Sequence, residues 1–287
     1  MAESFSHKWG QIIGNLIQEF ICETLQQIAD EHGLYLDYQK KRKARNSKKV
    51  TWQDRYGNLH DLDYVLERGG TEDTRGLPVA FIETAWRRYT KHSRNKAQEI
   101  EGALIPLADT YSHLNPFLGV VLAGVFTQGA IDQLESKGFK ILYIKNEKIV
   151  QAFITAGIDA SFNEKTLETN FENKISQWNS LSVQQRNNIK NQLLNIERSN
   201  IDNFISTLQQ SFARQVQGVT VIILHGLSQQ IANVEDAIGY IENYQDNLST
   251  IAPVLKYEID IRYNNGDIIQ AIFQSKVEAI KFLRTFV

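Results

Sequence analysis

The most restrictive feature of this sequence is an uninterrupted apolar run from Leu118 to Ala123, which reads Leu-Gly-Val-Val-Leu-Ala. A β-strand with apolar side chains on both faces is stable only where other elements cover both faces of its sheet. A second strand of this kind is predicted at Val79–Thr84, with Pro78 at its edge, where a missing N–H is tolerated. Helical patterns over Lys8–Glu31 and from Ser93 to about His113 can supply the covering layers. We therefore expect an α/β fold in which a mixed sheet is flanked by helices.

The rest of the first half alternates between short strands and helices. Periodic apolar residues and turn signals predict four further strands and two further helices. Pro106 should kink or interrupt the helix that begins near Ser93. The predicted strands are Leu34–Tyr38, Val50–Trp52, His60–Leu66 and Lys140–Ile144, and the predicted helices are Gln128–Lys137 and Glu147–Ala156.

The second half differs in composition. After Gly157 the chain becomes rich in Asn, Gln and Ser, with helical patterns from about Lys165 to Gln217. An Asn-Gly pair at Asn265-Gly266, between two alternating segments, is the strongest short signal for a hairpin. We therefore expect a sheet domain over residues 1–157 and, over residues 158–287, a helical region followed by a small α+β unit without internal repeats. The predicted elements of that unit are the strand Val219–Leu224, the helix Val234–Tyr244, the hairpin strands Tyr257–Tyr263 and Ile268–Phe273, and the helix Lys276–Phe286.

Basic residues are clustered, although the net charge of −2 argues against a protein that coats nucleic acid without selection. Seven of the ten residues from 40 to 49 are basic, and no acidic residue lies between Glu83 and Glu99. Such clusters on a near-neutral chain favour docking of a polyanion, and the alternative is an ordinary solvated surface. The first cluster comprises Lys40, Lys41, Arg42, Lys43, Arg45, Lys48 and Lys49, and the second comprises Arg87, Arg88, Lys91, Arg94 and Lys96.

Several protein classes are excluded by what the sequence lacks. No apolar run approaches the roughly 18 residues that a membrane helix needs, so no membrane association is expected. The single cysteine, Cys22, rules out an internal disulfide and a cysteine-rich zinc site, and a cytoplasmic location is expected. Neither a GxxxxGK[ST] phosphate-binding loop nor a GxSxG nucleophile motif is present.

Acidic residues accompany two successive predicted strands. Asp61 and Asp63 share one face of their strand because side chains alternate, and Glu83 lies near the end of the next strand. If these strands are neighbours, their carboxylates converge and supply the hard oxygen ligands that Mg²⁺ prefers. A buried carboxylate without a partner is costly, so Glu83 should be compensated, and a metal is one option. For Asp63 the alternative is a salt bridge at a strand end.

At these residues the chain resembles the PD-(D/E)XK nuclease superfamily, which includes most type II restriction endonucleases and several repair nucleases. The resemblance spans about Lys8 to Ala156 and implies a core of one helix, three strands, a helix and another strand. It assigns the family's first metal-binding acid to Asp63, with Asp61 as the fallback, and the strand glutamate to Glu83. Two residues of the first predicted helix could supply the additional acid that such families often carry, namely Glu19 and Glu23.

The chain departs from the family pattern at one position. The family's lysine stands two residues after the glutamate, where this chain has Ala85. Either the site is inactive or a cation reaches it from elsewhere, since lysines relocated to the following helix occur in the superfamily. Lys96, early in that helix, is the first candidate, and Lys91 and Arg87 are the others.

The resemblance implies a Mg²⁺-dependent deoxyribonuclease that hydrolyses phosphodiester bonds of double-stranded DNA, similar to a type II restriction endonuclease. Asp63 and Glu83 would bind the metal, and Lys96 would orient the attacking water and stabilise the phosphate. The two basic clusters would hold the DNA backbone with an affinity that falls with salt. A two-fold homodimer and a companion methyltransferase on another chain are further expectations, with residues 158–287 serving recognition or dimerisation.

Three alternatives stay open at this point. The first is a catalytically inactive nuclease fold that acts as a DNA-binding or defence-complex subunit, which Ala85 favours and the two acids disfavour. The second is a structure-selective repair or recombination nuclease. The third is an unrelated α/β protein whose basic residues are ordinary surface.

Overall fold

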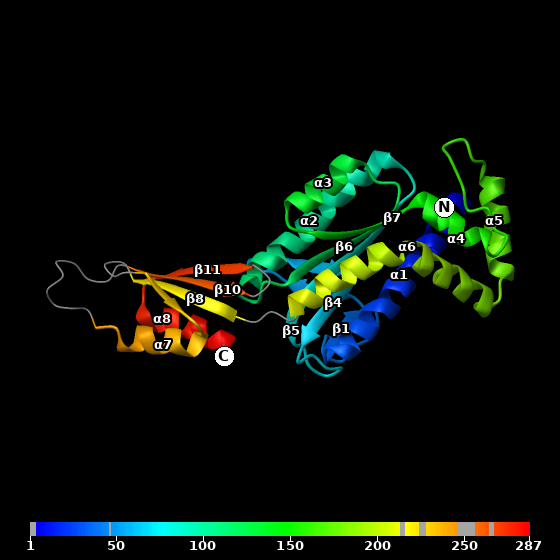
Figure 1. Cartoon of the computed structure of the whole chain (residues 1–287). Helices are drawn as coiled ribbons and strands as arrows, with labels where there is room; N and C mark the ends of the chain where they lie inside the picture. Colours follow the sequence, from blue (N-terminus) through cyan, green and yellow to red (C-terminus); the bar gives the residue numbers. More distant parts are fainter. Residues whose placement is uncertain (1–3, 46, 213–215, 224–227, 246–255, 264–266) are drawn as a thin grey trace. The chain divides into compact units, whose positions relative to one another are not determined.

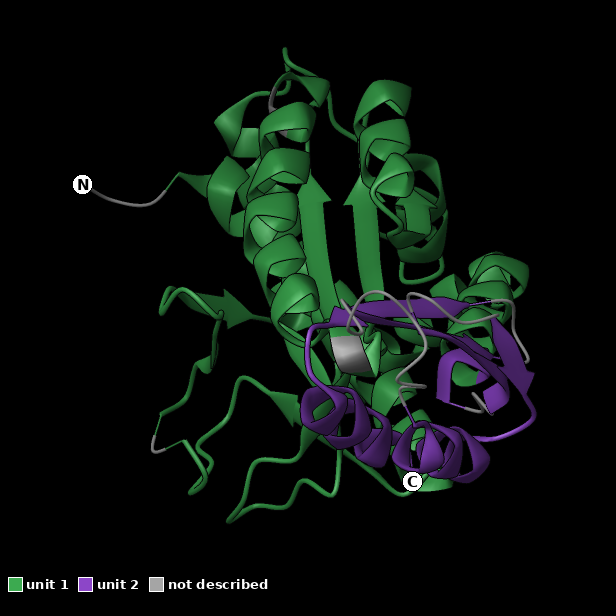
Figure 2. Cartoon of the chain, turned by 90° about the vertical axis from the view of Figure 1, so that its left-hand side faces the viewer, with its two compact units in different colours: residues 1–209 green, residues 210–287 purple. Residues whose placement is uncertain are grey.

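The computed structural model describes the chain except residues 1–3, 46, 213–215, 224–227, 246–255 and 264–266. It divides into two compact units, residues 1–209 and residues 210–287 (Figure 2). Within the described ranges, no helix combines the length and the apolar character needed to cross a membrane.

A mixed five-stranded sheet forms the centre of the first unit, as the sequence predicted. Its first three strands in spatial order pair antiparallel, and the third, fourth and fifth pair parallel. In spatial order the strands are β1 (Leu34–Tyr38), β4 (Tyr64–Arg68), β5 (Leu77–Arg87), β6 (Phe117–Gly124) and β7 (Lys140–Lys145).

Helices cover both faces of this sheet (Figure 1). On one face α1 (Phe5–Glu31) lies beside α6 (Val183–Phe212), and α2 (Ser93–Thr110) and α3 (Gln128–Ser136) pack on the other face. This arrangement explains the apolar run of β6, since seven of its eight residues are buried between the two helical layers. A shorter helix, α4 (Asn146–Ile154), follows β7.

The helix α2 continues through Pro106, although the sequence predicted a kink or interruption there. Leu104 and Leu107, on either side of the proline, are completely buried against the sheet. This packing holds the last turn of α2 in place up to Thr110, because tertiary burial outweighs the loss of one backbone hydrogen bond.

The predicted strand His60–Leu66 is two strands in the structure. β3 (Leu59–Leu62) pairs with β2 (Val50–Gln53) in a separate hairpin, and β4 begins at Tyr64 in the central sheet. Asp63 is the residue between them. The chain changes direction there because both the backbone N–H and the carboxylate of Asp63 are bonded to β5.

The first unit extends to residue 209, beyond the boundary at 157 that the composition suggested. Two helices that follow Gly157, α5 (Glu168–Ser180) and α6, pack on it. The Glu168 carboxylate accepts a hydrogen bond of 3.0 Å from the backbone N–H of Ser6 at the start of α1. The composition changes after Gly157 because the surface becomes richer in amides, but the apolar residues of these two helices pack against the rest of the first unit.

The second unit is a small α+β fold, as predicted. The four strands described in it form one antiparallel sheet, and the two described helices pack on one face of that sheet. The predicted residue Leu224 and the tip of the predicted hairpin, residues 264–266, lie outside the described part of the chain. Along the chain the elements are β8 (Val216–Ile223), β9 (Gln229–Ile231), α7 (Val234–Asn243), β10 (Tyr257–Tyr263), β11 (Ile268–Phe273) and α8 (Lys276–Leu283).

This unit consists of two successive strand–strand–helix repeats, which the sequence did not reveal. The first strands of the repeats, β8 and β10, pair at the centre, and the second strands, β9 and β11, form the two edges. Each helix begins with a side-chain cap: Asn233 accepts from the Asp236 N–H, and Ser275 accepts from the Glu278 N–H. The sequence does not show the repeat because the two copies have buried residues at similar spacings and a polar cap before each helix, rather than the same residues.

Candidate functional site

The central sheet splits at Tyr64, the first residue of β4, because β5 continues beyond this point without β4 beside it. Pairing between β4 and β5 ends at Tyr64 and Ile82, whereas β5 continues along β6 to Arg87. The segment from Glu83 to Arg87 therefore has a strand partner on one side only, among the described residues. Asp63 lies at the branch point, next to this segment.

Asp63 and Glu83 brace the split by reciprocal hydrogen bonds. The backbone N–H of Asp63 donates to Oε1 of Glu83 at 3.0 Å. In return, Oδ2 of Asp63 accepts from the backbone N–H of Thr84 at 2.8 Å and from the Thr84 hydroxyl at 2.6 Å. The two acids that the sequence singled out are thus neighbours, because Asp63 donates to the Glu83 carboxylate and Thr84 of β5 donates to the Asp63 carboxylate. Thr84 was not anticipated, and its place directly after Glu83 in a β-strand was the only signal.

Each carboxylate keeps one oxygen free of these bonds. In the part of the chain that the structure describes, no hydrogen bond or ion pair engages Oδ1 of Asp63 or Oε2 of Glu83. Two carboxylate oxygens at one site suit Mg²⁺, which commonly takes one or two protein carboxylates and completes its octahedron with water or substrate phosphate. No group of three or more His, Cys, Asp or Glu side chains positioned to hold a metal occurs within the described ranges. The residues present therefore fit a site with two protein ligands.

Glu83 is held in an environment that disfavours its charge. The residue is 8% exposed, and burial, followed by the negative charge of Asp63, raises its pKa to about 8. The hydrogen bond from the Asp63 N–H and the positive charge of Lys96 act in the opposite direction but are weaker. A carboxyl pKa raised this far above its ordinary value is common at functional sites, and a bound cation would favour the ionised form.

Among the described side chains, no cation is in contact with the two carboxylates. Ala85 is buried in the core, and Nζ of Lys96 lies 3.3 Å from the Glu99 carboxylate. Arg87 approaches the same carboxylate at 3.9 Å, and Lys91 is exposed. Lys96 is close enough to influence the pKa of Glu83, so it is the candidate cation with an electrostatic connection to the site.

The supporting acids lie at different distances from the Asp63–Glu83 pair, and only Glu19 shares a pocket with Asp63. Glu19 lines the same pocket as Asp63, a pocket of about 200 Å³ that also includes Gln18 and Cys22. Asp61, the fallback metal ligand, lies instead on the separate hairpin, where one carboxylate oxygen accepts from Lys49 at 2.6 Å and the other from Thr51 at 2.6 Å. The expectation that Asp61 and Asp63 share a face is wrong, because the strand breaks between them. Glu23 forms a 2.6 Å ion pair with Lys190.

The first basic cluster contains two structural arginines. Arg42 has a completely buried side chain, which pairs with Glu67 at 2.6 Å and with Asp37 at 2.8 Å. Arg45, whose side chain is 1% exposed, pairs with Asp37 at 3.1 Å. Neither guanidinium is available to DNA, so their assignment to the nucleic-acid surface is corrected: Arg42 neutralises Asp37 of β1 and Glu67 of β4, and Arg45 neutralises Asp37.

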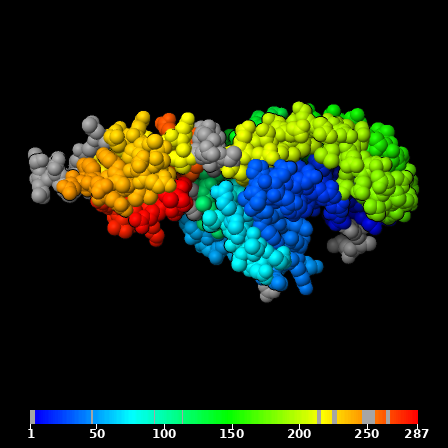
Figure 3. Space-filling view, turned by 60° about the horizontal axis from the view of Figure 1, so that its bottom comes forward, coloured from blue at the N-terminus to red at the C-terminus, as the bar shows by residue number. Residues whose placement is uncertain are grey.

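The lysines of this cluster remain on the surface. Lys41, Lys43 and Lys48 line one pocket of about 330 Å³. Lys43 and Lys49 are exposed but paired with Asp73 and Asp61, and Lys40 lies 3.9 Å from Glu72. Figure 3 shows the chain between β1 and β4, light blue to cyan, beside α1 in darker blue. This surface therefore carries less free positive charge than the sequence suggested.

The residues of the second basic cluster also differ in their surroundings. The guanidinium of Arg88 lies 4.6 Å from the Tyr89 ring centre and 5.3 Å from that of Phe171, which gives it a packing role. Arg94 is exposed at the start of α2.

Comparison with known proteins adds little. No family model matches the chain, and no curated protein matches it. A crystal structure of a protein of unknown function, AF1548, is similar over 63% of this chain and 99% of that chain, with 13% identical residues and a TM-score of 0.28. Similarity at that level carries no inference about fold or activity.

Proposed function

We propose that this chain is a Mg²⁺-dependent deoxyribonuclease of the PD-(D/E)XK type, similar to type II restriction endonucleases, that hydrolyses phosphodiester bonds of duplex DNA. The observation that supports it most is the braced pair at the sheet split. Asp63 and Glu83 each use one carboxylate oxygen to hold the other strand and keep a second oxygen without a hydrogen bond among the described residues. Apart from the inserted β2–β3 hairpin, the order of α1, the antiparallel strands β1, β4 and β5, the helix α2 and the parallel strand β6 is also the order expected of the family core.

In this proposal Asp63 and Glu83 would hold the metal, which would supply an activated water and charge stabilisation at the phosphate. Glu83 must lose its proton to act as a ligand, so metal and proton compete for it. Lys96 contributes positive charge near the scissile phosphate when Glu99 releases it. Glu19, in the same pocket as Asp63, can accept hydrogen bonds from water at the site.

Substrate binding in this proposal rests on the exposed lysines and not on the whole basic cluster. Lys41, Lys43 and Lys48 share one pocket, and each phosphate contact would add to the salt dependence of binding. Such contacts position the DNA backbone without reading sequence.

Cleavage of phage-type duplex DNA tests the proposal, with Mg²⁺ or EDTA and with three variants. We expect Mg²⁺-dependent cutting that falls at least about 100-fold in Asp63→Asn and Glu83→Gln, because each removes a metal ligand. Asp61→Asn is the matched control, since Asp61 is two residues away and is bonded to the β2–β3 hairpin, and its activity should stay near that of the unaltered protein. Full activity in Glu83→Gln would contradict the proposal.

An inactive, DNA-binding fold is the second candidate, and a specific observation favours it. The family's lysine position holds the buried Ala85, and Lys96 is paired with Glu99. Under this candidate, DNA binding is independent of Mg²⁺ and no cleavage occurs on any duplex, whereas charge reversal at Lys41 and Lys48 weakens binding.

A further inference from the structure

A groove lies between the first half of α1 and the end of β5 that extends beyond the split in the sheet. β4 does not reach this part of β5, so the helix and the strand line a common pocket there. The pocket has a volume of about 540 Å³, within the range of roughly 300–1,000 Å³ that is usual for small-molecule sites. Gly10 and Gly14 are among its lining residues on the α1 side, and Trp86, Arg87 and Arg88 are among those on the β5 side.

The two glycines of α1 differ in whether packing explains them. A Cβ atom at Gly10 would lie 2.8 Å from Cζ3 of Trp86, so the indole can reach the helix only because this residue is glycine. A Cβ atom at Gly14 would meet nothing within 4 Å outside the backbone of the helix itself. Glycine in a helix interior is less favourable than alanine by roughly 1 kcal/mol, so Gly14 weakens α1 without a packing reason in the fold. The open space beside Gly14 suits a bound molecule.

Trp86 gives the groove an aromatic wall whose position is fixed. Its ring makes an edge contact with Phe162, with ring centres 6.2 Å apart, and Tyr89 makes an edge contact with the same ring at 6.2 Å. The indole stays partly exposed and lines the pocket. Such a wall suits a planar ligand, since stacking of a nucleic-acid base on an aromatic side chain contributes about 1–3 kcal/mol.

Two arginines and no acidic residue line the groove, as far as the chain is described. Arg88 lies over two aromatic rings, 4.6 and 5.3 Å from their centres, and its Nη1 is buried without a hydrogen-bond partner among the described residues. Stacking occupies the faces of a guanidinium and leaves its in-plane N–H groups for an anion. Arg87 donates to the Trp86 carbonyl at 3.0 Å, and it lies 3.9 Å from the Glu99 carboxylate, too far for a hydrogen bond. Both guanidinium groups therefore have donors left for an anionic ligand.

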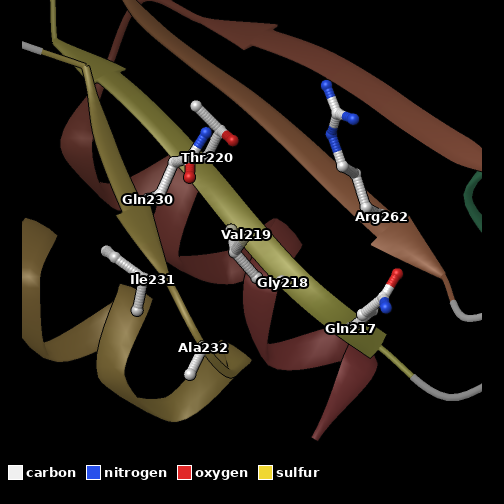
Figure 4. Close-up of a pocket in the computed structure, with 8 residues that line it drawn as sticks. All are labelled: Gln217, Gly218, Val219, Thr220, Gln230, Ile231, Ala232 and Arg262. Atoms are coloured by element: carbon white, nitrogen blue, oxygen red, sulfur yellow. The ribbon is translucent and has the colours of Figure 1, made fainter.

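A pocket in the second unit makes a useful comparison. It lies against β8, β9 and β10 and has a volume of about 430 Å³ (Figure 4). Its described lining includes one charged residue, Arg262, and no aromatic residue. A pocket of similar size is thus present without an aromatic wall or a pair of arginines, and Arg262 can serve as a control.

We propose that the groove between α1 and β5 binds a single nucleotide, with its base against Trp86 in the space beside Gly14 and its phosphate at Arg87 and Arg88. A nucleotide combines the planar ring and the anion that the groove favours, and the fork of an arginine matches phosphate oxygens. The ligand is either a free nucleotide or an unpaired nucleotide of a single strand, because both present the same groups. The proposal concerns binding alone and does not depend on cleavage by a site at Asp63 and Glu83.

Calorimetric titration of the full chain in EDTA tests both parts of the ligand. Deoxyadenosine monophosphate should bind at least about tenfold more tightly than deoxyadenosine, which lacks the phosphate, and than inorganic phosphate, which lacks the base. Arg88→Gln should remove most of the advantage over deoxyadenosine. Arg262→Gln, in the pocket of the second unit, is the matched control and should leave the affinity unchanged.

Filling the groove tests its location. Gly14→Leu places a side chain in the open space and should weaken binding at least about tenfold. Gly102→Leu is the matched control, because a Cβ atom at this interior glycine of α2 would also meet nothing within 4 Å, so both variants gain the same helix propensity. Trp86→Leu should weaken binding as well, whereas Trp86→Phe keeps an aromatic ring and should retain most of it.

A single-stranded deoxyadenosine pentamer separates the two sources of the nucleotide. Binding at least about tenfold tighter than that of the mononucleotide, with the gain lost in Gly14→Leu, identifies a strand, and equal affinities identify the free nucleotide. No saturable binding of either probe would overturn the proposal. So would affinities that stay unchanged in Gly14→Leu and Trp86→Leu while circular dichroism shows both variants folded. Because the titrations contain no metal, a failure of nucleotide binding is distinct from a failure of DNA cleavage.

Discussion

At the scale of single residues, a carboxyl group as enclosed as that of Glu83 binds a proton more tightly in the folded chain than in the unfolded one. Burial and the nearby charge of Asp63 raise its pKa from the ordinary 4.5 to about 8. The folded state therefore binds more protons than the unfolded state between these values, and the free energy of unfolding falls as the pH rises through them. A divalent cation opposes this loss, because it binds the ionised form.

Glu83→Gln should remove this pH dependence. Without divalent metal, the stability advantage of the variant over the unaltered protein should grow with pH, by at most about 1.4 kcal/mol per pH unit between 4.5 and 8. Urea unfolding at several pH values measures the difference, and Mg²⁺ should reduce it. Glu99→Gln, which alters an exposed carboxylate, serves as the control. A difference between Glu83→Gln and the unaltered protein that stays constant with pH would show that Glu83 titrates near its ordinary value.

At the scale of elements, Arg42 and Arg45 attach the segment between β1 and β2 to the central sheet. Every guanidinium nitrogen of Arg42 is bonded: to Glu67 and Asp37 by ion pairs, and to the carbonyls of Thr71 and Thr74. Arg45 donates to Asp37 and to the carbonyls of Tyr38, Lys40 and Ser47. These buried contacts fix a segment that would otherwise be a charged surface loop, and they leave its lysines outside.

Substitutions within this segment should therefore separate stability from binding. Arg42→Ala leaves Glu67 buried without its partner and should lower the free energy of unfolding by about 3–5 kcal/mol. Lys48→Ala, at an exposed position, should change it by less than about 0.5 kcal/mol but reduce the salt dependence of DNA binding. Chemical denaturation and binding titrations at two salt concentrations give both quantities. Equal destabilisation by the two substitutions would contradict a structural role confined to the arginines.

At the scale of the whole molecule, each compact unit has its own core. The core of the second unit contains only residues from 216 onward, including Val221 and Ile259, and a core of the first unit is built around the central sheet with Leu104 and Leu122. Each unit therefore contains the apolar surface that it needs to fold.

Core substitutions should affect the two units separately. Ile259→Ala should destabilise the second unit by about 2–5 kcal/mol, and Leu104→Ala should do the same to the first, because each leaves a cavity in a tightly packed core. Differential scanning calorimetry should resolve two transitions, of which each substitution lowers a different one. A single transition that both substitutions shift would show that the units unfold together.

What the sequence determined by itself follows from local patterns. Apolar runs and helical periodicity predicted the α/β class, the hairpin of the second unit and the order of elements in the first 157 residues except for the division of His60–Leu66, because burial of a face imposes a period on the residues that form it. The same patterns identified Asp63 and Glu83, since each stands in or beside an apolar strand. Their nuclease role remains a proposal.

Only the tertiary structure decided what the charged residues do. The partner of Arg42 lies 25 residues away at Glu67, and the bonds that break the strand at Asp63 come from residues 20 and 21 positions further along the chain. A basic residue that is free for a polyanion and one that neutralises a buried acid look identical in sequence, because the energy of a charge depends on its solvent exposure and on neighbours brought by distant segments. The unit boundary at 209 likewise became visible only in the tertiary structure, because it depends on which distant segments pack together.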